Sequence, residues 1–161
     1  MLPEKPMRYT LPVVLVIALG CSLNGMPVHI VVPNDFKGEV RIVQDKSQGL
    51  DVVPTAGRYV YSISADGVLY VKSLQPFGPM HKETAGYEDG TSLPSEHETW
   101  IGPNGEPANL GKDAIVLSGG GESSGMNKPP TITFFVGSTI EYEEWQGKQA
   151  EAIMRRQADK H

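Results

Sequence analysis

The 161-residue sequence contains one cysteine, Cys21, so no disulfide can form within a single chain. It is also poor in basic charge, with 14 lysines and arginines against 19 aspartates and glutamates, and its formal net charge is −5. Arg155-Arg156 is the only basic pair that stands out. A chain of this kind is unsuited to nucleic acid and is repelled by anionic lipid surfaces. Any membrane contact therefore requires an attached anchor.

The N-terminal apolar run, residues 11–19, is too short for a stable membrane span. As a helix it would reach about 14 Å, roughly half the thickness of the bilayer's hydrocarbon core. Lys5 and Arg8 precede the run, which is the layout of a secretory signal peptide. We therefore expect residues 1–20 to be a signal peptide. An uncleaved anchor would need the run extended over residues 9–23.

Cys21 lies immediately behind this apolar run. Residues 18–21, Ala-Leu-Gly-Cys, resemble the lipobox of bacterial lipoproteins, in which cleavage before the cysteine leaves it lipidated and N-terminal. Ala18 and Leu19 depart from the usual pattern, so cleavage at an ordinary small-x-small site and free secretion remain an alternative. We predict lipidation at Cys21, with residues 21–27 as a tether. The protein is then a membrane-anchored lipoprotein of the bacterial cell envelope, facing the periplasm or the cell exterior.

Short β-branched and aromatic runs between turn residues indicate strands in the rest of the chain. The expected strands are 28–32, 36–44, 58–63, 68–71, 114–117 and 131–136. In the second of these, Val40 and Ile42 alternate with Arg41 and Val43, which predicts one buried face. The turn at residues 65–67, Ala-Asp-Gly, predicts a hairpin between the third and fourth strands.

Residues 75–113 are rich in glycine and proline and predict one long loop, whereas the pattern after Gly137 predicts a helix. Ser138 and Glu141 have the spacing of a capping box, and the apolar residues that follow fall roughly on one stripe. The sequence therefore predicts a mainly β chain with one C-terminal helix. Its expected parts are a single antiparallel β-sandwich over 28–145 and a helical tail over 146–161.

Three segments carry a family resemblance: VPNDFKG at 32–38, YSISADGV at 61–68 and FFVG at 134–137. They resemble the landmarks of an uncharacterised family of small bacterial lipoproteins. The domain of that family is similar to transthyretin-like or carboxypeptidase-regulatory-like β-sandwiches. The resemblance spans about residues 28–145 and implies the fold, but it implies no activity and no site residues.

A candidate nucleophile lies in the segment 121–125, Gly-Glu-Ser-Ser-Gly, which matches G-x-S-x-G. That motif exposes its serine, here Ser123, on a turn between a strand and a helix. Pro129-Pro130 opposes a helix at this point, so we expect a flexible turn. The glycines at 119–121 match neither G-x-G-x-x-G nor a Walker motif, and no cofactor is expected.

The segment 81–98 gathers potential metal ligands without the spacing of a metal site. Those ligands are His81, Glu83, Glu88, Asp89, Glu96, His97 and Glu98. No H-E-x-x-H is present, so we expect a solvated acidic loop and no metal. His29, inside an expected strand, is interpreted as structural.

Exposed aromatic side chains are the remaining candidates for ligand contacts. The candidates are Tyr59, Tyr61, Tyr70, Phe77, Tyr87, Trp100 and Trp145. Trp100, in the loop rich in glycine and proline, is the residue we single out for ligand binding. The leading hypothesis is a non-enzymatic module that binds an envelope protein or a glycan, or has a structural role. The alternative is a small envelope hydrolase that uses the 81–98 loop or Ser123.

Overall fold

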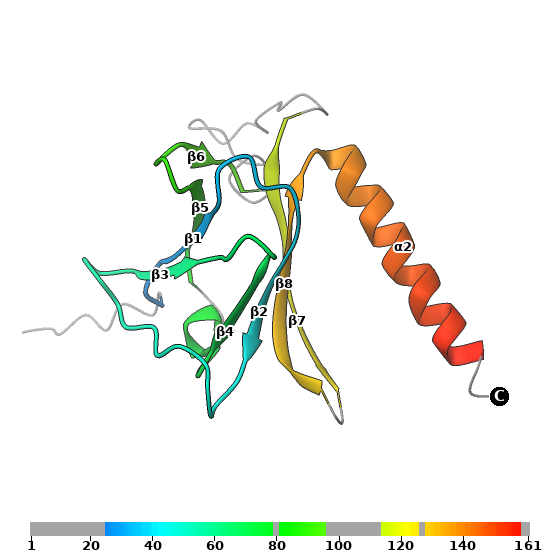
Figure 1. Ribbon diagram of the computed structural model, residues 1–161, viewed down its shortest axis with the longest axis horizontal. Helices are drawn as coiled ribbons and strands as arrows, with labels where there is room; N and C mark the ends of the chain where they lie inside the picture. The colour runs from blue at the N-terminus through cyan, green and yellow to red at the C-terminus, as the bar shows by residue number, and fades with distance from the viewer. Residues whose placement is uncertain (1–24, 79–80, 96–113, 126–127, 159–161) are drawn as a thin grey trace, which may run out of the picture.

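The computed structural model describes residues 25–78, 81–95, 114–125 and 128–158, and the chain is mainly β with one C-terminal helix (Figure 1). The elements are β1 (Val28–Val32), β2 (Gly38–Gln44), β3 (Tyr59–Ser62), β4 (Val68–Val71), the 3-10 helix η1 (Gln75–Phe77), β5 (Glu83–Tyr87), β6 (Ser92–Leu93), β7 (Val116–Gly125), β8 (Lys128–Gly137) and α2 (Thr139–Ala158). Mainly β structure and a single C-terminal helix are as the sequence predicted.

The strands form two four-stranded sheets of mixed direction. Sheet A has the order β3-β1-β5-β6, and sheet B has the order β4-β2-β8-β7. β1 runs parallel to β3 and β5, and β2 runs parallel to β4, whereas β2-β8, β7-β8 and β5-β6 are antiparallel. The prediction of a purely antiparallel arrangement is therefore wrong.

The source of this error is the turn at residues 64–67, which joins the two sheets. β3 and β4 are consecutive in the chain but belong to different sheets, so the predicted hairpin is wrong. The Arg41 N–H donates to the Gly67 carbonyl at 2.8 Å, which ties the turn to β2. Gly67 has a φ of +77°, and a Cβ there would clash with the Glu39 carbonyl. Residue 67 is therefore a glycine because the backbone of β2 approaches it closely, and not because it forms a hairpin turn.

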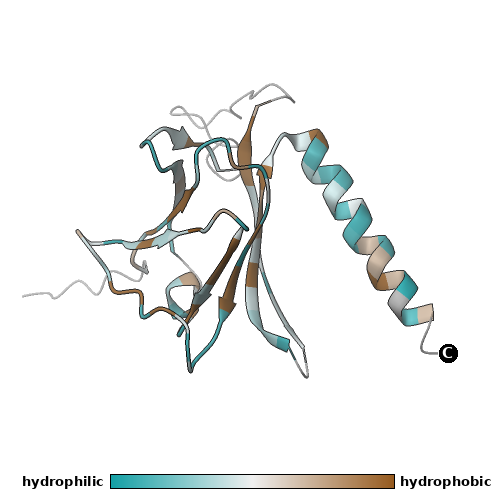
Figure 2. Ribbon diagram, in the orientation of Figure 1, coloured by the Kyte–Doolittle hydropathy of each residue, from teal (hydrophilic) through white to brown (hydrophobic). Residues whose placement is uncertain are grey.

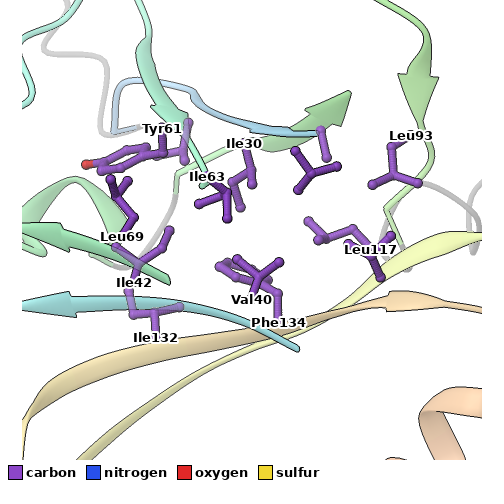
Figure 3. Packing of buried hydrophobic residues seen from close by; sticks show 14 of the residues in the cluster. Ile30, Val40, Ile42, Tyr61, Ile63, Leu69, Leu93, Leu117, Ile132 and Phe134 are labelled. Atoms are coloured by element: carbon purple, nitrogen blue, oxygen red, sulfur yellow. The ribbon is translucent and has the colours of Figure 1, made fainter. Parts of the chain in front are cut away.

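Both sheets contribute side chains to one hydrophobic core (Figure 3). Ile30 and Tyr61 come from sheet A, and Ile42 and Phe134 come from sheet B, each at most 1% exposed. The predicted burial of Ile42 is thus confirmed, whereas Tyr61, one of the aromatic candidates for ligand contacts, belongs to the core. The hydroxyl of Tyr61 is enclosed without a hydrogen-bond partner among the described residues, and burial raises its pKa.

The prediction of one long loop over 75–113 is wrong for residues 83–93. β5 lies inside sheet A, where it pairs with both β1 and β6. Its weak apolar pattern hid it, because the sequence is Glu-Thr-Ala-Gly-Tyr and only Ala85 and Gly86 are buried. The backbone N–H and C=O groups of β5 are paired with both neighbouring strands, so β5 is held in the sheet although it has few apolar side chains.

Helix α2 begins at the predicted capping box. The Ser138 N–H donates to Glu141 Oε2 at 2.7 Å, and the Glu141 N–H donates to Ser138 Oγ at 3.3 Å. The expected division at residue 145 falls inside this helix. Most of its residues are hydrophilic, as the colours of the ribbon show (Figure 2). Among the described residues, no helix combines the length and apolarity needed to cross a membrane.

Candidate functional site

Four side chains form a row across the face of sheet B that points away from the core. Register pairs Tyr70 of β4 with Val43 of β2, Val43 with Thr131 of β8, and Thr131 with Ser123 of β7. Their chain neighbours, such as Leu69 and Ile132, point into the core, and side chains alternate along a strand. At about 4.8 Å between strands, the row is about 14 Å wide.

This row lies in an open groove of about 650 Å³. The groove is lined by Arg41, Val43, Tyr70, Ser123, Ser124, Gly125, Lys128, Pro129 and Thr131. Val43 is 8% exposed and forms part of its floor, whereas Tyr70 is 54% exposed. The groove therefore combines an accessible aromatic ring with a row of hydroxyl groups.

The β7–β8 hairpin supplies one side of the groove, although sequence interpretation expected a loop there. Register shifts occur between Gly119 and Gly121 and between Ser123 and Gly125. Gly119 and Gly120 have φ values of +99° and +104°, which favour glycine. Such bulges bend a strand and increase its twist. The bent hairpin carries Ser123 and Ser124, which line the groove.

The charged side chains of the groove are basic. Arg41 and Lys128 line it, and no carboxylate does so among the described residues. Arg41 Nε lies 3.4 Å from Glu39 Oε1, a contact that is about half exposed and therefore weak. The charged side chains that line the groove are thus positive on a chain whose net charge is −5. A hydrogen bond from the Ser64 hydroxyl lowers the pKa of Asp66 nearby, and the charge of Arg41 lowers it further.

Helix α2 covers the neighbouring part of the same face. The rings of Tyr142 and Trp145 lie with their centroids 6.0 Å and 5.5 Å from that of Phe135. Trp145 Nε1 donates to Glu39 Oε2 at 3.1 Å, so Glu39 connects the helix to Arg41. A smaller hollow of about 300 Å³ lies at this contact, beside the ion pair of Lys37 and Glu141. The helix limits the open groove to the rest of the sheet face.

Ser123 lies within β7, opposite Thr131, and the chain continues into the hairpin. The strand–turn–helix context of a nucleophile elbow is therefore not present at Ser123. The expected flexible turn is also wrong, because residues 118–125 and 128–130 belong to strands.

The potential metal ligands of the 81–98 segment that the structure describes lie at opposite ends of β5. His81 Nε2 lies 3.5 Å from Glu83 Oε2, and His81 Nδ1–H donates to the Gly78 carbonyl at 2.8 Å. Glu88 and Asp89 follow the far end of β5. No cluster of three metal-ligating side chains occurs in the described parts of the chain. Glu96, His97 and Glu98 lie outside those parts.

Two predicted site residues, Cys21 and Trp100, also lie outside the described residues and stay predictions. His29 lies on β1, with Nδ1 2.8 Å from Thr84 Oγ1. Burial, and then the charge of Arg58, lower the pKa of His29, in keeping with a structural role. Tyr70 was one of the aromatic candidates in the sequence, but Trp100 was the one chosen from among them. The alternation of Tyr70 with Leu69 and Val71 is the signal that could have placed it on an outer face.

No family model matches the chain, and no curated protein matches it. Among solved structures, the chain is similar to a Bacillus anthracis protein provisionally named a lipoprotein, with a TM-score of 0.40 and 12% sequence identity. That similarity covers 81% of this chain and 93% of the other. A similarity at this level establishes neither fold nor function. The function is therefore argued from the residues of the chain itself.

Proposed function

We propose that the protein is a lipid-anchored bacterial envelope protein whose β-sandwich domain binds a ligand and catalyses no reaction. The observation that carries the binding role is the groove on sheet B, with Tyr70 exposed at one end of a row that ends at Ser123. Concave sites with a few placed polar groups are the usual form of ligand sites. The core shared by both sheets supports the sandwich arrangement.

The positions of the candidate catalytic groups favour binding over hydrolysis. Ser123 lies in the groove on the outer face of sheet B. His81 packs against Phe77, with ring centroids 5.7 Å apart, and Phe77 in turn contacts the core residue Tyr61. Nucleophilic catalysis needs the serine and its base within hydrogen-bond reach. No histidine is among the described residues that line the groove.

The anchor of this proposal is a lipid on Cys21. Attached acyl chains contribute about 0.8 kcal/mol of membrane affinity per buried methylene, so two or more chains hold a protein stably. Residues 21–27 would separate the lipid from β1. At about 3.5 Å per residue, they would let the domain lie about 25 Å from the bilayer surface.

Fractionation of cells tests the anchor. Wild-type protein should be found with the membrane and should incorporate a fatty-acid probe, whereas Cys21→Ser should be soluble and unlabelled. Ser22→Ala is the matched control and should behave as wild type. A wild-type protein that takes up no label would refute lipidation.

Site-directed crosslinking in the native host tests the binding role. A photoreactive amino acid at Ser124, on the groove, should give adducts, and the same group at Glu88, an exposed turn on sheet A, should not. Equal yields from the two positions, or no adducts from either, would contradict a binding role for the groove.

A further inference from the structure

The groove has the chemistry of a surface for sugar rings. Tyr70 presents an aromatic ring that is 54% exposed, against which the apolar C–H face of a sugar can pack. Thr131 and Ser123 continue the row. The Thr131 hydroxyl donates to the Pro129 carbonyl at 3.1 Å and can accept from a ligand, whereas the Ser123 hydroxyl can both donate and accept. A stacking ring at one end of the row and two hydroxyl groups at the other end, along about 14 Å, fit a short run of linked sugars.

The basic side chains that line the groove indicate which class of sugar it would bind. Arg41 and Lys128 are the charged residues among those that line it, although acids outnumber bases in the chain. Glu39 and Asp66 act on Arg41 from outside the lining. A guanidinium has five N–H donors, so the 3.4 Å contact with Glu39 leaves most of them for a ligand. Guanidinium groups match carboxylates in shape and bind them through paired hydrogen bonds. The groove is therefore complementary to a carboxylated glycan.

An extended peptide is less well suited to the same surface. Peptides that bind β-sheets commonly pair with an exposed strand edge, because main-chain hydrogen bonds supply the affinity. The groove lies on a sheet face, where the strands' N–H and C=O groups are directed at one another within the sheet. Contacts there come from side chains, and Val43, its most apolar member, is only 8% exposed.

We propose that this groove binds a linear glycan that carries carboxylate groups. Tyr70 stacks on a sugar ring, Arg41 and Lys128 pair with the carboxylates, and Ser123 and Thr131 bind ring hydroxyls. This assignment rests on the proposed binding function and names its ligand class.

Titration calorimetry of the full-length protein in detergent tests the assignment. The probes are hexamers of galacturonate and of mannuronate, and a hyaluronan hexasaccharide. At least one should bind, and the neutral oligomer made by reducing its carboxylates should bind about tenfold or more weakly. Poly-glutamate of similar charge should not compete.

Variants locate the binding. Tyr70→Ala and Arg41→Gln should each weaken binding about tenfold, and Lys128→Gln about threefold, whereas Tyr70→Phe should retain it. Arg58→Gln removes one exposed positive charge beside sheet A and should leave affinity unchanged. Unchanged thermal melting of each variant shows that its fold is intact.

Several results would overturn the glycan assignment. The first is that none of the three carboxylated probes binds. The second is that poly-glutamate competes equally, which would indicate an acidic peptide as the ligand. The third is that Tyr70→Ala binds as tightly as the wild type. If crosslinking from position 124 still succeeds, the binding function stands and only the ligand class fails. If it also gives no adducts, both fail.

Discussion

The two faces of sheet B differ in what their side chains do, although the same four strands form both. On the inner face, Ile42, Ile132 and Phe134 are at most 3% exposed and join the core shared with sheet A. On the outer face, Arg41 and Tyr70 lie open to solvent along the groove. Because side chains alternate along a strand, neighbouring residues belong to different faces. Substitutions one residue apart can therefore test the stability of the core and the proposed binding separately.

The outer face is itself divided by helix α2. The first half of the helix covers Phe135 through Tyr142 and Trp145, and the groove begins beyond that contact, at Arg41. In the second half of the helix, Ile153 and Met154 are 55% and 60% exposed. The docked half thus contributes to the packing of the sheet, and the far half contributes little.

The largest effect should come from a change on the inner face. Ile42→Ala should lower the free energy of unfolding by about 2 to 5 kcal/mol, because it leaves a cavity in the core. Its chain neighbour provides the control, since Arg41→Ala should cost under about 0.5 kcal/mol. Both are measured by denaturant melts. Similar losses from the two variants would remove the distinction between the faces.

A smaller loss should follow from undocking the helix on the outer face. Trp145→Ala removes a partly buried ring and its hydrogen bond to Glu39, and should cost about 1 to 3 kcal/mol. Hydrogen exchange should then accelerate in α2 before it does in sheet B, since the helix opens locally. Met154→Ala is the control in the exposed half. If it costs as much as Trp145→Ala, the proposed division of the helix is wrong.

Local alternation was the part of this fold that the sequence could predict. The expected burial of Val40 and Ile42 needs only a period of two, and the helix start needs only Ser138 and Glu141 three residues apart. Strand pairing depends on contacts far apart in the chain. β2 pairs with β8 about ninety residues away, and the residues of either strand alone do not predict this pairing. Gly67 was interpreted as part of a hairpin turn because a turn between two sheets uses the same residues.

The candidate site was harder to predict because it depends on that pairing. Tyr70, Val43, Thr131 and Ser123 come from four strands and meet only through the register of sheet B. Ser123 was a candidate because it lies in a G-x-S-x-G motif, but the strand–turn–helix context of that motif is not present at Ser123. Tyr70 belongs to no motif. Its neighbours Leu69 and Val71 fixed its outward direction, but they did not reveal the partners beside it.

The capping box should contribute less than the docked tryptophan. Ser138→Ala removes the hydroxyl that accepts the Glu141 N–H and should cost about 0.5 to 2 kcal/mol. Ser138→Asp keeps an acceptor at the N-cap and should restore most of the loss. Helix content by circular dichroism and a thermal melt measure both variants. A Ser138→Asp variant as unstable as Ser138→Ala would show that capping is not the cause.

The carboxylate of the capping box, Glu141, should make the stability of the fold depend on pH. The Ser138 N–H, and then Lys37, lower the pKa of Glu141. A carboxyl with a lowered pKa stabilises the fold above its ordinary pKa of 4.5, and that contribution is lost as pH falls through the lower folded value. Glu141→Gln should therefore flatten the stability curve below about pH 4.5. An unchanged slope in urea melts would contradict this role.

The smallest effect on stability should come from Tyr70, the residue on which the proposed binding depends most. Tyr70→Ala removes a ring that is 54% exposed and makes no hydrogen bond through its hydroxyl among the described residues, so unfolding should change by under about 0.5 kcal/mol. Tyr61→Ala, in the core, should cost about 2 to 5 kcal/mol, as Ile42→Ala should. The two tyrosines come from the strands on either side of the 64–67 turn, and denaturant melts compare them directly. If Tyr70→Ala destabilises the fold by more than about 1 kcal/mol, the ring supports the sheet itself, and loss of glycan binding by that variant would no longer identify a contact.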